Sequence, residues 1–372
     1  MKVCHVIHDL RRGGAEHLLV DLAGVAAGCG IEMSVVSLMP TAGHGYADAL
    51  RRAGVEVRSL GLRSRWDPRA GSELADVLRE LGSDLVHSHM KHADLVAARA
   101  ATTLDLPMVS SLHVMEDGVG GLGRFKRRLA MRARDRSAVR ILAVSGALRE
   151  WYLGLSGRDP STVLVLHNGV PAPPDYPPGH RAAVRASLGV PDDSVMAVTV
   201  VILRPGKGVD DLLAAAAALP PEPDIRFVIA GSGPEENRLR SEAGRLGLLG
   251  ERVLFPGFTE DVAGLLAAAD LLVHPSHADA LATAVIHGMA AGLPVVATDV
   301  GGTGEIVEPG HGVLVPAGDP EALGAAIGEL AGDPPRRQAM SETARERFAA
   351  EFDIRVWAGR LRDVYQEVLS ER

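Results

Sequence analysis

The stretch from Leu271 to Ile306 reads LLVHPSHADALATAVIHGMAAGLPVVATDVGGTGEI. It opens with an apolar run that ends at His274, passes through a short loop, and becomes helical from about Leu281. Pro294 ends the helix, and a second apolar run, 295–297, follows. This order predicts one strand-helix-strand repeat of an open parallel sheet. A phosphate fits the loop, because a helix amino terminus offers unpaired N–H groups and partial positive charge.

The loop and the first turns of this helix carry the groups that we expect to meet a ligand. Asp279 lies in the loop, and Thr283 and His287 follow at spacings that place all three toward one cleft. The backbone of Ala280 and Leu281 lies between them, at the expected helix start. The segment therefore predicts a binding site at a strand end.

The second half of the chain has two more glycine turns. A β-branched run, 195–203, leads into Arg204-Pro205-Gly206-Lys207-Gly208, where Lys207 is one of only 4 lysines beside 35 arginines. An ammonium next to two glycines suits a diphosphate, although an exposed loop lysine would look the same. A second strand, 225–230, leads into the turn from Gly231 through Gly233 to Pro234.

The first half alternates strands and helices, which predicts βαβ units. After the first strand, Gly13 and Gly14 open a helical run, either as a ligand loop or as a tight turn. His113 follows the strand 107–112, where open α/β folds place ligand-facing residues. There it is expected to donate a hydrogen bond to a ligand, or to be a satisfied strand-end histidine.

Three more histidines, His87, His89 and His92, suggest a metal cluster, because alternate strand residues share a face. No carboxylate joins them at ligand spacing, so a metal is not expected. We expect them to line the acceptor side of a cleft or to end a strand.

A glycine series and a basic helix complete the first half. Gly118, Gly120 and Gly123 match G-x-G-x-x-G, but the match is separated from the preceding strand and predicts a loop, not a dinucleotide site. The segment 124–136 is a basic helix with a few apolar residues. It predicts a solvated face, or a contact with an anionic membrane or a charged acceptor.

Length and composition set the outer limits. The 372 residues fit two domains, and we place them at 1–170 and 180–353, joined by the proline-rich linker 171–179. Two isolated cysteines and the lack of a long apolar run indicate a cytoplasmic protein, peripheral at the inner membrane face if the basic helix binds lipid. With a net charge of −8, we do not expect a nucleic-acid partner.

Positions 288–305 resemble a segment of the retaining nucleotide-sugar glycosyltransferases of family 4. That family has Ala-Met-Ala-x-Gly-x-Pro-Val-Val-Ala followed by Gly-Gly-x-x-Glu, and here only Gly288 departs from it. Two glutamates with seven residues between them come earlier in the family, and Asp279 and His287 stand at those positions. The sequence from Asp279 to Thr283 is similar to a family variant, Asp-Ala-Leu-Pro-Thr.

Other motifs of this family have counterparts here. The resemblance implies that the loop of Gly13 and Gly14 faces donor and acceptor, and that His113 lies beside the donor sugar and phosphates. Lys207 would bind the donor diphosphate. The family arginine falls on Ile202, so Arg204 is the candidate replacement. Gly231 and Gly233 would lie near the base and ribose.

The resemblance implies the GT-B fold, in which two Rossmann-like doubly wound parallel-sheet domains face each other across a cleft, with the terminal helix 354–372 packing back on the first. It implies retention, with His113, Lys207 and Asp279 as catalytic residues. No Asp-x-Asp occurs, so we expect neither a metal nor another cofactor. The donor is a nucleotide-sugar and the acceptor hydroxyl belongs to a saccharide, a lipid-linked saccharide or a natural product. The alternatives are an inactive binding partner and a sugar-nucleotide epimerase.

Overall fold

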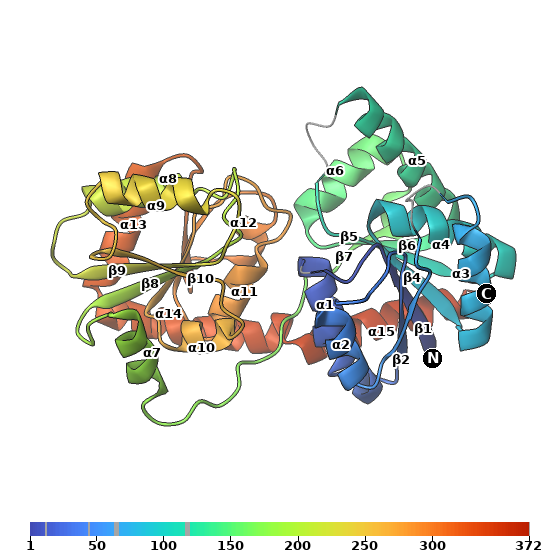
Figure 1. Ribbon diagram of the computed structural model, residues 1–372, viewed down its shortest axis with the longest axis horizontal. Coiled ribbons are helices and arrows are strands. Elements are labelled where there is room, and N and C mark those ends of the chain that lie inside the picture. The colour runs from blue at the N-terminus through green and yellow to red at the C-terminus, as the bar shows by residue number, and fades with distance from the viewer. Residues whose placement is uncertain (12, 44, 63–66, 116–119, 372) are drawn as a thin grey trace. The chain divides into compact units, whose positions relative to one another are not determined.

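The computed structural model describes residues 1–11, 13–43, 45–62, 67–115 and 120–371. The chain divides into two compact units, Met1–Gly169 with Ile354–Arg372, and Val170–Asp353 (Figure 1). Gly118 of the glycine series lies outside the described residues. None of the helices in the described ranges is both long and apolar enough to cross a membrane.

The first unit is built on a seven-stranded parallel sheet with the order β3-β2-β1-β4-β5-β6-β7. Successive strands are added on one side of β1 up to β3 and on the other side from β4 onward, so the switch point lies between β1 and β4. Open α/β sheets bind ligands at the carboxyl ends of the strands at such a switch point. The strands are β1 (Lys2–Ile7), β2 (Glu32–Ser37), β3 (Glu56–Ser59), β4 (Leu85–His89), β5 (Met108–Leu112), β6 (Ala138–Ala143) and β7 (Val163–Val165).

Helices cover both faces of this sheet (Figure 1). The apolar residues of α1, α2 and α15 share one cluster with Val3 and Ile7 of β1. On the opposite face, Asp94 of α4 accepts a 2.6 Å hydrogen bond from Ser88 of β4. The helices are α1 (Gly14–Ala23), α2 (Gly45–Arg52), α3 (Ala70–Leu81), α4 (Met90–Leu104), α5 (Gly121–Ser137), α6 (Gly146–Ser156) and α15 (Ile354–Ser370).

The second unit repeats this plan with six parallel strands in the order β10-β9-β8-β11-β12-β13. Its switch point therefore lies between β8 and β11. The strands are β8 (Val195–Val200), β9 (Ile225–Ala230), β10 (Val253–Gly257), β11 (Leu271–His274), β12 (Val295–Thr298) and β13 (Gly312–Val315). The helices are α7 (His180–Leu188), α8 (Val209–Ala218), α9 (Glu236–Arg245), α10 (Val262–Ala267), α11 (Thr283–Ala290), α12 (Thr303–Ile306), α13 (Pro320–Gly332) and α14 (Pro334–Arg347).

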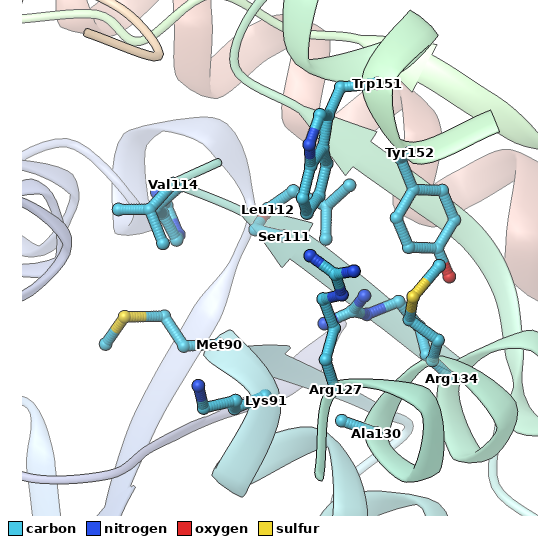
Figure 2. A pocket seen from close by; sticks show the side chains of 12 residues that line it. Met90, Lys91, Ser111, Leu112, Val114, Arg127, Ala130, Arg134, Trp151 and Tyr152 are labelled. Atoms are coloured by element: carbon cyan, nitrogen blue, oxygen red, sulfur yellow. The ribbon is translucent and has the colours of Figure 1, made fainter. Parts of the chain in front are cut away.

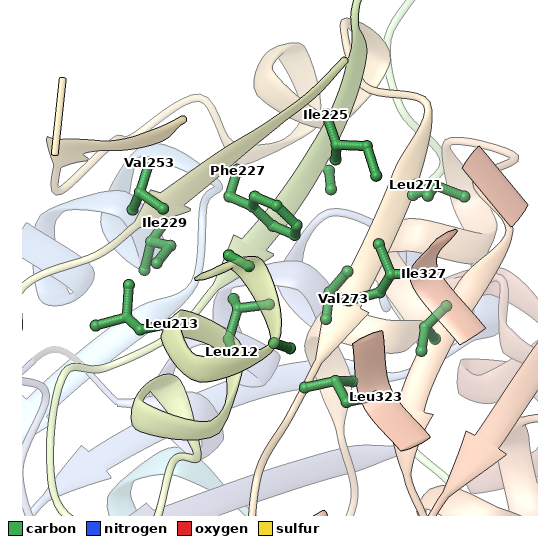
Figure 3. Close-up of a cluster of buried hydrophobic side chains, with 14 of the residues drawn as sticks. Leu212, Leu213, Ile225, Phe227, Ile229, Val253, Leu271, Val273, Leu323 and Ile327 are labelled. Atoms are coloured by element: carbon green, nitrogen blue, oxygen red, sulfur yellow. The ribbon is translucent and has the colours of Figure 1, made fainter. Parts of the chain in front are cut away.

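Alternate strand residues of the second unit pack into a core beneath α8, α9 and α13 (Figure 3). Phe227 and Val273 point from β9 and β11 toward Leu212 of α8 and Ile327 of α13, and all four are at most 1% exposed. On the other face, Gly288 of α11 lies so close to Leu272 that an added Cβ would overlap it. This close approach fixes α11, and with it the loop before α11, against β11.

The predicted fold class of two doubly wound parallel sheets is confirmed. The strand expected at 225–230 has those bounds. One expectation needs correction, and one strand was missed. Helix α11 begins at Thr283, two residues after the expected Leu281, and the short strand β13 was not predicted. The chain before Thr283 is held instead by a backbone bond of 3.1 Å from Gly302 N–H to the Ala280 carbonyl.

Candidate active site

Two loops of the second unit meet at its switch point. One loop follows β8 and carries Lys207, and the other follows β11 and carries Asp279. The Lys207 Nζ and Asp279 Oδ1 atoms are 2.5 Å apart, and the two side chains are only 11% and 16% exposed. Sequence reasoning selected both residues separately, and the structure places them in one ion pair.

His274, the last residue of β11, completes this polar cluster. Its Nε2 lies 2.9 Å from Asp279 Oδ2, and its side chain is 6% exposed. Burial raises the pKa of Asp279, but the contacts with His274 and Lys207 outweigh burial and lower it to about 2. Asp279 is therefore a fixed negative charge that orients Lys207. The sequence identified His274 only as a strand end, because its partner is set by how the next loop folds back.

Replacing Asp279 with asparagine should destabilise the second unit in a pH-dependent way. The depressed pKa stabilises the folded state fully above the unfolded value of about 4, and this stabilisation is lost as the pH falls toward 2. We expect Asp279→Asn to lower the free energy of unfolding by about 2 kcal/mol at pH 7, and by clearly less at pH 3. Urea unfolding of both proteins at the two pH values measures the difference. An equal loss at both values would contradict the assigned charge.

Glycines bring the loops of this site into backbone contact. A Cβ on Gly208 would overlap the carbonyl oxygen of Pro275, and one on Gly301 would overlap that of Asp279. The His277 N–H also donates to the Gly206 carbonyl over 2.9 Å. The loops after β8, β11 and β12 are thus packed backbone to backbone, which sets the position of the Lys207–Asp279 pair.

The turn after β9 is built in the same way. An added Cβ on Gly231 would overlap the Val201 carbonyl, and one on Gly233 would overlap the Leu203 carbonyl. These glycines therefore have a packing role, whether or not a ligand lies near them. Arg204, in the loop against which they pack, is exposed and makes no ion pair within the described ranges. Its guanidinium is available to an anion.

The remaining candidates of this unit lie on or beside α11. No side chain caps its amino terminus, where Ala282 is the N-cap. Leu281 is buried, whereas Ala280, Thr283 and His287 are half-buried. His287 thus retains some exposure, as a ligand-contacting residue requires.

In the first unit, Gly13 and Gly14 begin α1, with Gly13 as the N-cap. A Cβ on Gly13 would overlap the carboxylate of Glu16, which is 8% exposed. Burial raises the pKa of Glu16. Gly13 therefore allows a buried carboxylate to lie against the loop that was expected to face a ligand.

His113 follows β5 and lines a pocket together with Ser111, Arg127 and Trp151, among other residues. In this pocket (Figure 2) the Arg127 guanidinium lies 5.8 Å from the centre of the Trp151 ring. Burial lowers the pKa of His113 to about 4, so the ring is neutral at physiological pH. Its Nε2 lies 3.0 Å from Nδ1 of His89.

The expectation for the other histidines was wrong in part. His87 and His89 are 1% and 2% exposed and face the core, so they do not line a cleft. His92 lies on α4, where its ring is tilted against that of His8 with centroids 5.1 Å apart. His5 of β1 joins His87 and His89 instead, because β1 and β4 pair with His5 opposite His87. Strand register of this kind is not readable from one sequence.

Comparison with known proteins agrees with this architecture. The family model described as Glycosyltransferase Family 4 matches residues 12–172, and the one described as Glycosyl transferases group 1 matches residues 180–347. The alpha-maltose-1-phosphate synthase of Mycolicibacterium smegmatis is 30% identical, over 76% of this chain and 79% of its own length. The D-inositol 3-phosphate glycosyltransferase of Streptomyces scabiei is 31% identical, over 77% of this chain and 69% of its own length.

Solved structures show the same fold. Anabaena HepE in complex with UDP has a TM-score of 0.86 and 24% identity, covering 99% of this chain and 100% of its own. A glycosyltransferase from Rickettsia africae has the same TM-score with 18% identity, covering 100% and 99% of the two chains. The protein is therefore a glycosyltransferase with the GT-B fold, and the chain belongs to the family 4 glycosyltransferases.

Proposed function

We propose that the protein transfers a sugar from a nucleotide-sugar donor to an acceptor hydroxyl with retention of configuration and without a metal. The observation that carries this proposal is the largely buried Lys207–Asp279 pair at the switch point of the second unit. Asp279 uses one hydrogen of the Lys207 ammonium, which leaves two N–H groups for a diphosphate. Exposed Arg204 in the same loop adds a second positive charge.

In this proposal, these residues stabilise the leaving nucleoside diphosphate. Lys207, Arg204 and the amino-terminal N–H groups of α11 neutralise the charge that develops on its phosphates. No second carboxylate is assigned as a nucleophile, so the acceptor attacks the face that the phosphate leaves, and the phosphate helps to take its proton. His113 donates a hydrogen bond to the donor sugar or phosphates.

The histidine at position 287 affects the choice of donor. A neutral imidazole offers one acceptor nitrogen, whereas a glutamate accepts from both ribose hydroxyls. Loss of such a charge-assisted contact costs about 1.5 to 3 kcal/mol. Either the donor carries a deoxyribose nucleotide, or Arg204 or Glu305 compensates, or the protein binds without catalysing. The Anabaena structures hold UDP and UDP-glucose, which supports testing uridine nucleotides first.

Calorimetric titration with UDP, GDP and dTDP tests the donor class. We expect one nucleotide to bind saturably in the micromolar range, with the same affinity in EDTA. Binding of none would favour the inactive partner, and turnover of the sugar nucleotide without an acceptor would favour the epimerase. Once an acceptor is found, the anomeric configuration of the product by NMR tests retention.

A membrane contact through residues 124–136 and a cytoplasmic location at the inner membrane face remain part of the proposal. Its support is a row of exposed arginines, spaced four residues apart on α5, which make no ion pairs within the described ranges: Arg124, Arg128, Arg132 and Arg136. Exposed Phe125 lies at the start of this row. Co-sedimentation with anionic but not with zwitterionic vesicles would support a lipid surface over a merely solvated helix.

A further inference from the structure

Three imidazole rings form a continuous chain from the core of the first unit to its pocket. They belong to neighbouring strands β1 and β4 and to the residue after β5 (Figure 1). His5 Nδ1 lies 3.0 Å from His89 Nε2, and His89 Nδ1 lies 3.0 Å from His113 Nε2. Successive rings are stacked, with centroids 5.3 Å apart in both pairs.

All three rings are neutral at physiological pH. Burial lowers the pKa of His5 to about 3, that of His89 well below its usual value and that of His113 to about 4. A neutral imidazole carries one ring proton, so it donates with one nitrogen and accepts with the other. The chain therefore has two internally consistent arrangements, with the protons directed either outward to His113 or inward to His5.

The inner end of the chain selects between these arrangements. His5 is fully buried, and its Nε2 has no hydrogen-bond partner. With the protons directed inward, this nitrogen would carry a buried N–H group without an acceptor. With the protons directed outward, it has only an unused lone pair, and orphaned buried donors are the rarer of the two in proteins. His5 then donates through Nδ1 to His89, and His89 donates through Nδ1 to His113.

His87 borders the chain but is fixed by other partners. Its Nδ1 lies 2.5 Å from the hydroxyl of Tyr365 on α15, and its Nε2 lies 2.8 Å from Ser111 Oγ. Tyr365 is fully buried and its pKa is raised well above the usual value, so the phenol keeps its proton and donates it to His87. His87 must then donate to Ser111.

A metal is the competing explanation for these histidines. One ring nitrogen each of His5, His87 and His89 lies within 4.8 Å of the others. An ion bound to all three would take a nitrogen of His89 from His5 or His113, and a nitrogen of His87 from Tyr365 or Ser111. The existing contacts already satisfy every ring nitrogen of these three residues except His5 Nε2. The hydrogen-bonded chain explains the cluster better.

We propose that His5 and His89 are positioning residues that hold His113 as its Nδ1–H tautomer, so that His113 presents a hydrogen-bond donor to an oxygen of the bound sugar nucleotide. Nδ1 of His113 makes no hydrogen bond to the residues that the structure describes, and His113 lines the pocket. The inference rests on the proposed role of His113 beside the donor. It extends that role, because two buried histidines of the sheet, His5 and His89, would fix the tautomer of His113.

The tautomers can be read directly from long-range ¹H–¹⁵N NMR spectra of the ligand-free full chain labelled at histidine. We expect His113 to be the Nδ1–H form in the wild type. His5→Asn keeps a donor near the Nδ1 position and should preserve this form, whereas His5→Leu should give a mixture. His311 is fully buried in the other unit and bonds to the Ile306 carbonyl, so its signals should not change and serve as an internal reference.

Ligand affinity provides the functional readout. The affinity for UDP-glucose should fall about tenfold in His89→Leu and recover in His89→Asn, whose amide can still donate to His113. An Nε2–H form of His113 in the wild type would overturn the proposal. So would stoichiometric zinc in the purified protein that disappears in His5→Leu. Failure of UDP and UDP-glucose to bind would count against the proposed function alone, because the NMR result needs no nucleotide.

Discussion

Lys207→Ala is expected to weaken nucleotide binding by at least tenfold. The ammonium is a positive charge that the second unit holds, largely buried, at its switch point. A charge-assisted hydrogen bond to phosphate contributes about 1.5 to 3 kcal/mol, which corresponds to roughly ten- to 150-fold in affinity. Calorimetric titration of wild type and variant with the nucleotide that binds measures the change.

The ion pair complicates this experiment and also supplies its control. Lys207→Ala leaves Asp279 with His274 as a hydrogen-bond partner, and the carboxylate would then repel a phosphate. The double variant Lys207→Ala with Asp279→Asn removes that repulsion. If Lys207 contacts the phosphate itself, the double variant should still bind at least tenfold more weakly than Asp279→Asn. Equal binding by these two proteins would mean that Lys207 only neutralises Asp279, and the proposed role in leaving-group stabilisation would be wrong.

The sequence was sufficient to place Lys207 and Asp279 in the candidate site. Each follows an apolar run that ends in a glycine-containing or polar loop, so each could be assigned to the carboxyl end of a strand. In a doubly wound sheet β8 and β11 are neighbours at the switch point, and the pairing of the two side chains follows from that order. The resemblance to family 4 selected the same residues independently.

The residues that were missed depend on information that local pattern does not contain. His274 became part of the site because the loop after β11 folds back on the strand end. His5 joined His89 because of the register between β1 and β4, which shifts every neighbour if it changes by one residue. His87 and His89 were expected to line the acceptor side of a cleft or to end a strand. His89 does end β4, but neither residue lines a cleft, because their face of the sheet is covered by α15, whose Tyr365 reaches His87.

Two glycine substitutions in the loop that carries Lys207 should differ strongly in their effect on stability and nucleotide affinity, and one serves as the control for the other. Gly206 and Gly208 flank the lysine, and both have positive φ, +83° and +66°. An added Cβ on Gly206 would meet nothing within 4 Å, whereas on Gly208 it would overlap the Pro275 carbonyl. The two alanine variants therefore share the backbone strain and differ in the collision.

Gly206→Ala should lower the free energy of unfolding by about 1 to 2 kcal/mol, the cost of a left-handed conformation for an L-residue. Gly208→Ala should cost about 1 to 3 kcal/mol more, because the loops after β8 and β11 must separate. That separation also moves Lys207 away from Asp279, so nucleotide affinity should fall in Gly208→Ala much further than in Gly206→Ala. Urea unfolding and calorimetric titration of both variants test this. Equal losses of stability and of nucleotide affinity in the two variants would show that the loop accommodates the added methyl group without moving Lys207. Contact between the two loops would then not position the charge at this site.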